Sequence, residues 1–300
     1  MAEESNRRLL VIGYGSLLSG YGLLGERRAG NSRLIALDAE PVSIHNARRG
    51  LAKPSSHGSY LAMDIEPIDR AAPIWASIAG GNSGIGGLLL TFDRESAPMI
   101  ARREEYSPEA FERLIAIADR AGQPLGEYLL AIARATRFDL LGYRRALRSL
   151  LDYTSPGYVF HPVEIDDGRV AIIAIASGVD GSGDPAIRSR REEFAMHRLL
   201  SLEDALQLEL PGFDRAGQIG YFAECLLGGL HGVAIHDLAE SIAGDARCAA
   251  ELAEWISLHH ASERDRFIRA TSLDIARYGA RFPASAHPSM SALLKLAGVI

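Results

Sequence analysis

A glycine-punctuated turn near the start of the chain, Val11–Gly22 (VIGYGSLLSGYG), has the composition of a phosphate-binding or catalytic loop. A P-loop requires a lysine directly after its second glycine; Gly15 and Gly20 have the right separation, but Tyr21 follows. A dinucleotide-binding loop requires a third glycine at position 18, where the chain has Leu18, and a clear helix afterwards. The turn therefore predicts neither kind of phosphate site.

Ser16 in the same turn is the next candidate, as a nucleophile. A nucleophile elbow places glycines two residues before and two residues after the serine, but this chain has Tyr14 and Leu18 there. What remains is a strand that ends in Tyr14-Gly15-Ser16-Leu17. Backbone N–H groups of such a turn are already oriented, and glycine allows close approach, so they suit a carboxylate or a developing oxyanion.

The order of motifs along the chain resembles the γ-glutamylcyclotransferase-like family. In that family the first strand ends in a YGSL-type loop, and a later glycine-led strand is followed by a helical turn and a glutamate. Here Gly87–Asp93 (GLLLTFD) is followed by Ile100–Tyr106 (IARREEY), which puts Glu104 in the place of the family's catalytic acid. A histidine-glycine pair at His57 and the segment 158–178 resemble further family features, the latter its closing hairpin.

The resemblance covers residues 8–106 and 153–177, and the chain departs from it in three respects. A helical stretch, 107–152, separates Glu104 from the closing hairpin, where the family has a short link. Ala101 stands where the family usually has an aspartate. The C-terminal helical part has no counterpart in the family's minimal fold.

The resemblance implies an acyl transfer within one substrate. The α-amine of a γ-glutamyl compound attacks its own γ-carbonyl, closes a five-membered ring to 5-oxoproline and expels an amine or peptide. Holding the substrate folded can recover much of an effective molarity of about 10^5 to 10^8 M. Glu104 would move the proton, a contribution of about 10^2 to 10^4, and Tyr14, Gly15, Ser16 and Leu17 would bind the substrate. Glutathione, a γ-glutamyl amino acid, a γ-glutamyl amine and a biosynthetic intermediate with a γ-glutamyl cap remain open as substrates.

Plainer interpretations stand beside this one. Taken alone, Glu104 is more typical of a solvated carboxylate at a helix start, and the adjacent Glu105 is its competitor. Tyr106 is expected to pack, and His57 to be a structural histidine. A second hypothesis is a non-catalytic ligand-binding or interaction protein on the same fold. Three loop cations are left open as contacts for a substrate carboxylate: Arg48, Arg49 and Lys53.

The elements that must position these residues are read from hydrophobic patterning. Four apolar runs predict strands: LLVIGY, LIALDAEPVSIH, SYLAMDIEP and GIGGLLLTFD. The polar segment 46–59 is expected to be a functional loop, because it is too long for a tight hairpin. Asp166-Asp167-Gly168 predicts the turn of a later hairpin.

Helices are predicted between and after these strands. Ser107 is the expected N-cap of the first helix, with Pro108 at its first position and an apolar face that includes Phe111. A second helical stretch, 126–153, is expected to break near Phe138. After a loop at 178–185, five amphipathic segments are expected to be helical: 201–208, 217–232, 235–244, 248–260 and 262–279.

The predicted fold is therefore α+β. The resemblance implies a small mixed β-barrel of the γ-glutamylcyclotransferase-like type in residues 1–177, interrupted by the helical insertion 107–152. A helical C-terminal region, 178–300, is expected to pack on or beside the barrel.

The composition limits the classes of partner that the protein is expected to bind. The chain has 300 residues, 47% hydrophobic content and a net charge of −6, which together favour a globular protein that binds a small molecule rather than nucleic acid or a membrane. The N-terminus lacks the apolar stretch of a secretory signal, so a soluble cytoplasmic protein is predicted. Cys225 and Cys248 are expected to be buried thiols. No metal site and no cofactor is predicted, and the oligomeric state stays open.

Overall fold

The computed structural model describes residues 8–15, 17–18, 36–54, 60–78, 84–104, 106–153, 158–176, 202, 204, 207, 214–228, 235–270, 288–296 and 298. The expected loop at 178–185 lies outside these residues, and only residues 202, 204 and 207 of the expected helix 201–208 are among them.

A closed β-barrel lies at the centre of the fold, with the strand order β1-β6-β2-β5-β7-β8. Two of its pairings, β1 with β8 and β5 with β7, are parallel, and the others are antiparallel. The α+β class and the small mixed barrel predicted from the sequence are confirmed at this level. The six strands are β1 Arg8–Gly13, β2 Asp38–His45, β5 Trp75–Ser77, β6 Ile85–Asp93, β7 Tyr158–Ile165 and β8 Val170–Ala176.

A second sheet of two strands, β3 Ala47–Pro54 and β4 Leu61–Pro67, stands beside the barrel. The prediction of a loop over 46–59 is wrong for residues 47–54, because these pair antiparallel with β4. The pairing partner supplies the hydrogen bonds that the polar sequence of β3 gave no reason to expect, and burial of Leu51 adds to them.

The β7–β8 hairpin is confirmed. Its turn is Asp166-Asp167-Gly168, and Gly168 adopts φ +89°, a left-handed conformation that costs glycine little. The turn is closed by the backbone N–H groups of Gly168 and Ile165, which donate to Ile165 and Arg169.

The inserted helices begin and break as predicted. The Ser107 side chain accepts a hydrogen bond from the Ala110 N–H, and Pro108 occupies the first turn. The expected break near Phe138 is a left-handed kink at Arg137 and Phe138. The short helix η2 spans Arg94–Ser96, and the helices that follow are α3 Ala97–Arg103, α4 Pro108–Arg120, α5 Leu125–Ala135 and α6 Leu140–Leu151.

Aromatic packing joins these helices to the barrel. Phe111 of α4 stacks on Phe160 of β7 with a centroid separation of 4.4 Å, and Tyr106 packs against both rings. This confirms the prediction that Tyr106 packs. The contact of α5 with β8 is close because Gly126 has no side chain: a Cβ there would lie 2.4 Å from the carbonyl oxygen of Val170.

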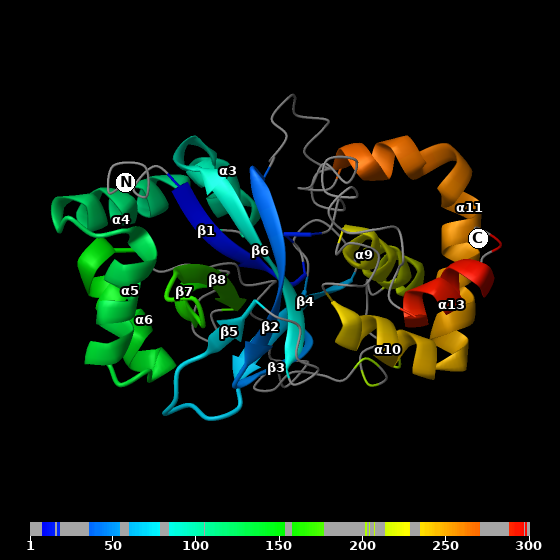
Figure 1. The fold of residues 1–300 in the computed structure, drawn as a ribbon, viewed down its shortest axis with the longest axis horizontal. Coiled ribbons are helices and arrows are strands. Elements are labelled where there is room, and N and C mark those ends of the chain that lie inside the picture. The colour runs from blue at the N-terminus through cyan, green and yellow to red at the C-terminus, as the bar shows by residue number, and fades with distance from the viewer. Residues whose placement is uncertain are drawn as a thin grey trace.

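The C-terminal helices cover the other side of the barrel from α4–α6 (Figure 1). They are α9 Arg215–Gly228, α10 His236–Gly244, α11 Ala246–Ala270 and α13 Pro288–Leu296. The prediction of two helices over 248–279 is wrong up to residue 270, because α11 continues through that range; residues 271–279 lie outside the description. The helix α13 was not predicted.

Hydrophobic side chains of the barrel, the insertion and the C-terminal helices belong to one core cluster. The C-terminal region is therefore packed on the barrel rather than held apart from it. Among the described residues, no helix combines the length and the apolar composition that a bilayer crossing requires.

A buried histidine in β7 makes stability depend on pH. His161 is 4% exposed, shares a hydrogen bond of 2.9 Å with the Pro162 carbonyl, and has its pKa lowered by burial to about 4. The unfolded chain binds the extra proton below about pH 6.5, so folding free energy is lost as the pH falls from there to about 4.

We expect this single group to cost about 3 kcal/mol over that window. Urea unfolding of the wild type and of His161→Gln across the window measures it. The variant should lose less stability than the wild type, and parallel curves would contradict the prediction.

Candidate functional site

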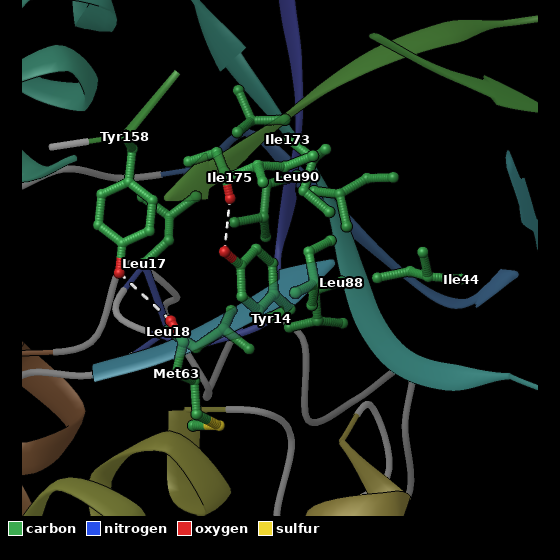
Figure 2. Packing of buried hydrophobic residues seen from close by; sticks show 14 of the residues in the cluster. Tyr14, Leu17, Leu18, Ile44, Met63, Leu88, Leu90, Tyr158, Ile173 and Ile175 are labelled. Carbon is green, nitrogen blue, oxygen red and sulfur yellow. Dashed lines mark hydrogen bonds between the residues drawn. The ribbon is translucent and has the colours of Figure 1, made fainter. Parts of the chain in front are cut away.

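The site begins at Tyr14, directly after β1. Its phenol donates a 2.5 Å hydrogen bond to the carbonyl oxygen of Ala174 on the neighbouring strand β8, and lies 3.5 Å from Oδ1 of Asp64 on β4. Figure 2 shows the ring among the apolar side chains of the barrel, with the hydroxyl turned to its acceptor. Tyr14 is therefore fixed in place from two sides.

The charges around Tyr14 are mixed. Burial raises the pKa of its phenol well above the ordinary value, and the negative charges of Asp64 and Glu104 raise it further, whereas the positive charge of Arg49 lowers it. At neutral pH the phenol is therefore a hydrogen-bond donor. The same interactions place two carboxylates and one guanidinium within electrostatic reach of this ring.

The turn that follows is tightly packed. The Leu18 N–H donates to the Gly15 carbonyl oxygen at 2.9 Å, and Leu17 and Leu18 are buried (Figure 2). A Cβ on Gly15 would lie 2.9 Å from Cβ of Met63 and 3.2 Å from the hydroxyl of Tyr221, so only glycine fits here. Ser16 lies outside the described residues.

Glu104 ends the helix α3. Its N–H donates to the Ile100 carbonyl at 3.1 Å, and the residue is only 2% exposed. The plainer interpretation of Glu104 as a solvated carboxylate at a helix start is therefore wrong on both counts. Ala101, one turn earlier, is fully buried, where the family pattern has an aspartate. Glu105 lies outside the described residues.

Helix α9 is hydrogen-bonded to β4 beside this turn. The side-chain amide of Gln218 bonds both backbone groups of Leu61, accepting from the N–H at 2.8 Å and donating to the carbonyl at 3.1 Å. The Tyr221 hydroxyl accepts from the Met63 N–H at 3.0 Å. The free edge of β4 is thereby satisfied by side chains, which removes a cost of unpaired buried backbone groups.

The same helix covers the turn itself. The Cys225 thiol donates to the Gly15 carbonyl at 3.5 Å, one turn after Tyr221. Burial raises the pKa of Cys225 strongly, so this sulfur is a thiol. Burial also raises the pKa of Cys248, to about 12. The expectation of buried thiols is confirmed for both cysteines.

The loop cations named from the sequence differ in exposure and in partner. Arg48 forms an exposed ion pair with Glu66, directly opposite on β4. The side chain of Arg49 is instead 6% exposed and is paired with Asp237 of α10. Lys53 lies in β3 without a described side chain, and His57 lies outside the described residues.

Several site residues were missed by sequence reasoning. Each carries a weak signal: Asp64 is a carboxylate in the apolar first part of the strand LAMDIEP, and Gln218 and Glu224 are polar groups inside the apolar segment of α9, where the charge of Glu224 acts on the Cys225 thiol. All three are buried. An ionisable or amide group in an apolar run needs a buried partner, and this is the signal that would have found them.

The described residues contain no group of three or more histidine, cysteine, aspartate or glutamate side chains that could hold a metal ion. A cavity of about 440 Å³ lies at the opposite end of the barrel, where β1 and β8 begin. Arg8, Asp38, Glu127 and Arg169 contribute charges to its wall. It does not include Tyr14 or Glu104 and belongs to a different region of the molecule.

Comparison of the chain with protein-family models, with curated proteins and with solved structures finds no match.

The hydrogen bond from Met63 to α9 gives a testable prediction. Tyr221→Phe removes the acceptor and leaves a buried backbone N–H unpaired, which we expect to cost roughly 1 to 3 kcal/mol of unfolding free energy. Tyr128→Phe, on α5 across the barrel, is the matched control. Urea unfolding measures both variants, and equal stability of the two would refute the role given to Tyr221.

Proposed function

We propose that the protein is a cyclotransferase that cleaves a γ-glutamyl amide within one substrate molecule. The α-amine nitrogen forms a bond to the γ-carbonyl carbon, and the amide C–N bond to the leaving group breaks. The α-ammonium loses two protons on becoming the lactam N–H; Glu104 takes them one at a time and delivers them to the departing nitrogen, which leaves as an ammonium. The products are 5-oxoproline and an amine or peptide, and atoms and charge balance without a cofactor.

The observation that supports this proposal most strongly is the position of Glu104. It is a buried carboxylate at the end of a helix, and its charge acts on the phenol of Tyr14, the residue that opens the Tyr14–Leu17 turn. A carboxylate that is so little exposed to solvent is suited to proton transfer, because the protein groups around it, rather than bulk water, set its acidity.

The turn would hold the substrate. Backbone donors of Gly15, Ser16 and Leu17 are proposed to bind the carboxylate or the oxyanion that forms at the γ-carbonyl carbon. Tyr14 is proposed to line the same site as a neutral hydroxyl, since its pKa is raised. The substrate class is a γ-glutamyl amide, with the leaving group open.

A specific observation favours a second candidate function. Helix α9 lies on the turn: the Cys225 thiol donates to the Gly15 carbonyl, and the Tyr221 hydroxyl lies 3.2 Å from the place where a Gly15 Cβ would be. A non-catalytic protein that uses this region to bind a ligand or a partner would retain helix α9 in this position. In that case Glu104 would have no role in turnover.

The experiment that separates the two is an assay of 5-oxoproline release by the full chain. The panel consists of glutathione, γ-glutamyl amino acids and γ-glutamyl amines. Release from at least one compound supports the cyclotransferase proposal. No release from any of them leaves the non-catalytic alternative.

A further inference from the structure

A carboxylate is held at the edge of the site by two groups from different strands. Asp237, in the first turn of α10, accepts a 3.0 Å hydrogen bond from the Gly86 N–H through Oδ1, and its Oδ2 lies 3.1 Å from Nε of Arg49. One aspartate thus joins a guanidinium on β3 to a backbone donor on β6.

The two groups that hold this carboxylate are also joined to each other. Nη2 of Arg49 donates to the Gly86 carbonyl, and Nη1 lies 3.8 Å from the sulfur of Met63. The guanidinium therefore has contacts with β6 of the barrel and β4 of the neighbouring sheet that do not involve α10.

The contact with Asp237 is the only one of these that reaches Arg49 from outside the strands. The Nε contact is an ion pair without the alignment of a hydrogen bond. The Asp237 side chain is 25% exposed, against 6% for Arg49. A buried guanidinium requires an anion, because leaving it unpaired is costly. Asp237 meets that requirement from the solvent side, and another carboxylate can do the same.

The position of the pair connects it with the turn. Met63, which contacts Arg49, has its Cβ 2.9 Å from the place where a Gly15 side chain would begin. Gly87, next to Gly86, lies against Gly13: a Cβ on Gly87 would be 3.3 Å from the Gly13 carbonyl oxygen. The carboxylate held by Arg49 is therefore beside the segment that leads into Tyr14.

We propose that Arg49 and the Gly86 N–H form a receptor for the substrate's α-carboxylate, and that Asp237 occupies this receptor until substrate displaces it. The proposal rests on the proposed function, since it takes the ligand to be a γ-glutamyl compound. It makes Asp237 a residue that sets substrate affinity, and it gives a reason why α10 lies over the site. Asp237 acts as an internal competitor.

The test is binding of 5-oxo-L-proline, which carries the α-carboxylate shared by all candidate substrates, measured by calorimetry on the full chain. Asp237→Asn should bind it about tenfold more tightly than the wild type, because an occupied receptor lowers apparent affinity by the fraction that is free. Glu254→Gln, an exposed carboxylate on α11, should bind as the wild type does. The double variant R49M/D237N should lose the gain.

Equal affinity of the wild type and Asp237→Asn overturns the proposal, as does a gain that persists in R49M/D237N. If Asp237→Asn fails to fold, hydrogen exchange of the wild type with saturating 5-oxo-L-proline decides instead. Displacement of Asp237 should speed exchange at Leu238 and Ala239, whose N–H groups bond the Ile235 carbonyl. Unchanged or slower exchange there overturns the proposal, and so does an absence of binding.

The proposed carboxylate receptor and the proposed cyclotransferase reaction can be refuted independently. A gain of 5-oxo-L-proline affinity in Asp237→Asn, with no 5-oxoproline release from any γ-glutamyl compound, keeps the receptor and removes the cyclotransferase. Release by the wild type with no gain in the variant keeps the reaction and removes the receptor.

Discussion

Glu104→Gln is expected to lower kcat/KM for 5-oxoproline release by about 10^2 to 10^4, because it removes the group proposed to carry the proton. Glutamine has the shape of glutamate, so the buried site at the end of α3 should stay filled and the chain should fold. The loss should appear in kcat more than in KM, since the substrate contacts are assigned to the turn. Steady-state kinetics with an active γ-glutamyl compound measure it.

Two further variants sharpen this result. Glu104→Asp keeps the carboxylate but withdraws it by one methylene, and a displacement of about 1 Å can cost 10^2-fold. Glu112→Gln removes an exposed carboxylate from the neighbouring helix α4 and should leave the rate unchanged. Full activity in Glu104→Gln would remove Glu104 from the mechanism, and equal losses in Glu104→Gln and Glu112→Gln would point to a general effect of charge.

Phe160→Ala is expected to give a large loss of stability, about 3 to 5 kcal/mol. The ring of Phe160 is 1% exposed, stacks on Phe111 at 4.4 Å and packs against Tyr106 at 5.3 Å between ring centroids. Its removal leaves a cavity between the barrel and α4, which the two neighbouring rings can fill only in part. Denaturant unfolding with an unchanged slope would assign the loss to the folded state.

Phe160→Leu is the matched control for this prediction. Leucine keeps most of the apolar volume, so the expected cost stays below about 1.5 kcal/mol. A loss under about 1 kcal/mol for Phe160→Ala would mean that α4 does not depend on this aromatic contact.

The packing of the C-terminal helices against the Tyr14–Leu17 turn connects the proposed reaction with the proposed carboxylate receptor. Gln218, Tyr221 and Cys225 bring α9 onto β4 and Gly15, and Asp237 brings α10 onto Arg49. Under both proposals, a γ-glutamyl compound would reach Tyr14 by displacing part of these helices. The substrate's own carboxylate would favour this movement by replacing Asp237.

Local interactions explain which elements were predicted correctly. The N-cap at Ser107, the left-handed break at Phe138 and the Asp-Gly turn at Gly168 each depend on residues within one turn of the chain. The strand β3 was missed for the opposite reason. Its polar sequence becomes a strand only because β4 pairs with it, and a pairing partner leaves no periodic signal in β3 itself.

The sequence by itself determined the class of fold, the mixed barrel, the inserted helices and the pairing of a YGSL turn with a distant glutamate as a chemical hypothesis. The strands and helices follow from hydrophobic period, caps and turns, which act over a few residues, whereas the mixed barrel and the pairing of the turn with Glu104 were implied by the resemblance to the γ-glutamylcyclotransferase-like family. Only the tertiary structure decided that Glu104 is buried, that Asp64 joins Tyr14, and that Asp237 meets Arg49. Gln218 is 157 positions from Leu61, and such contacts depend on how the whole chain closes on its core.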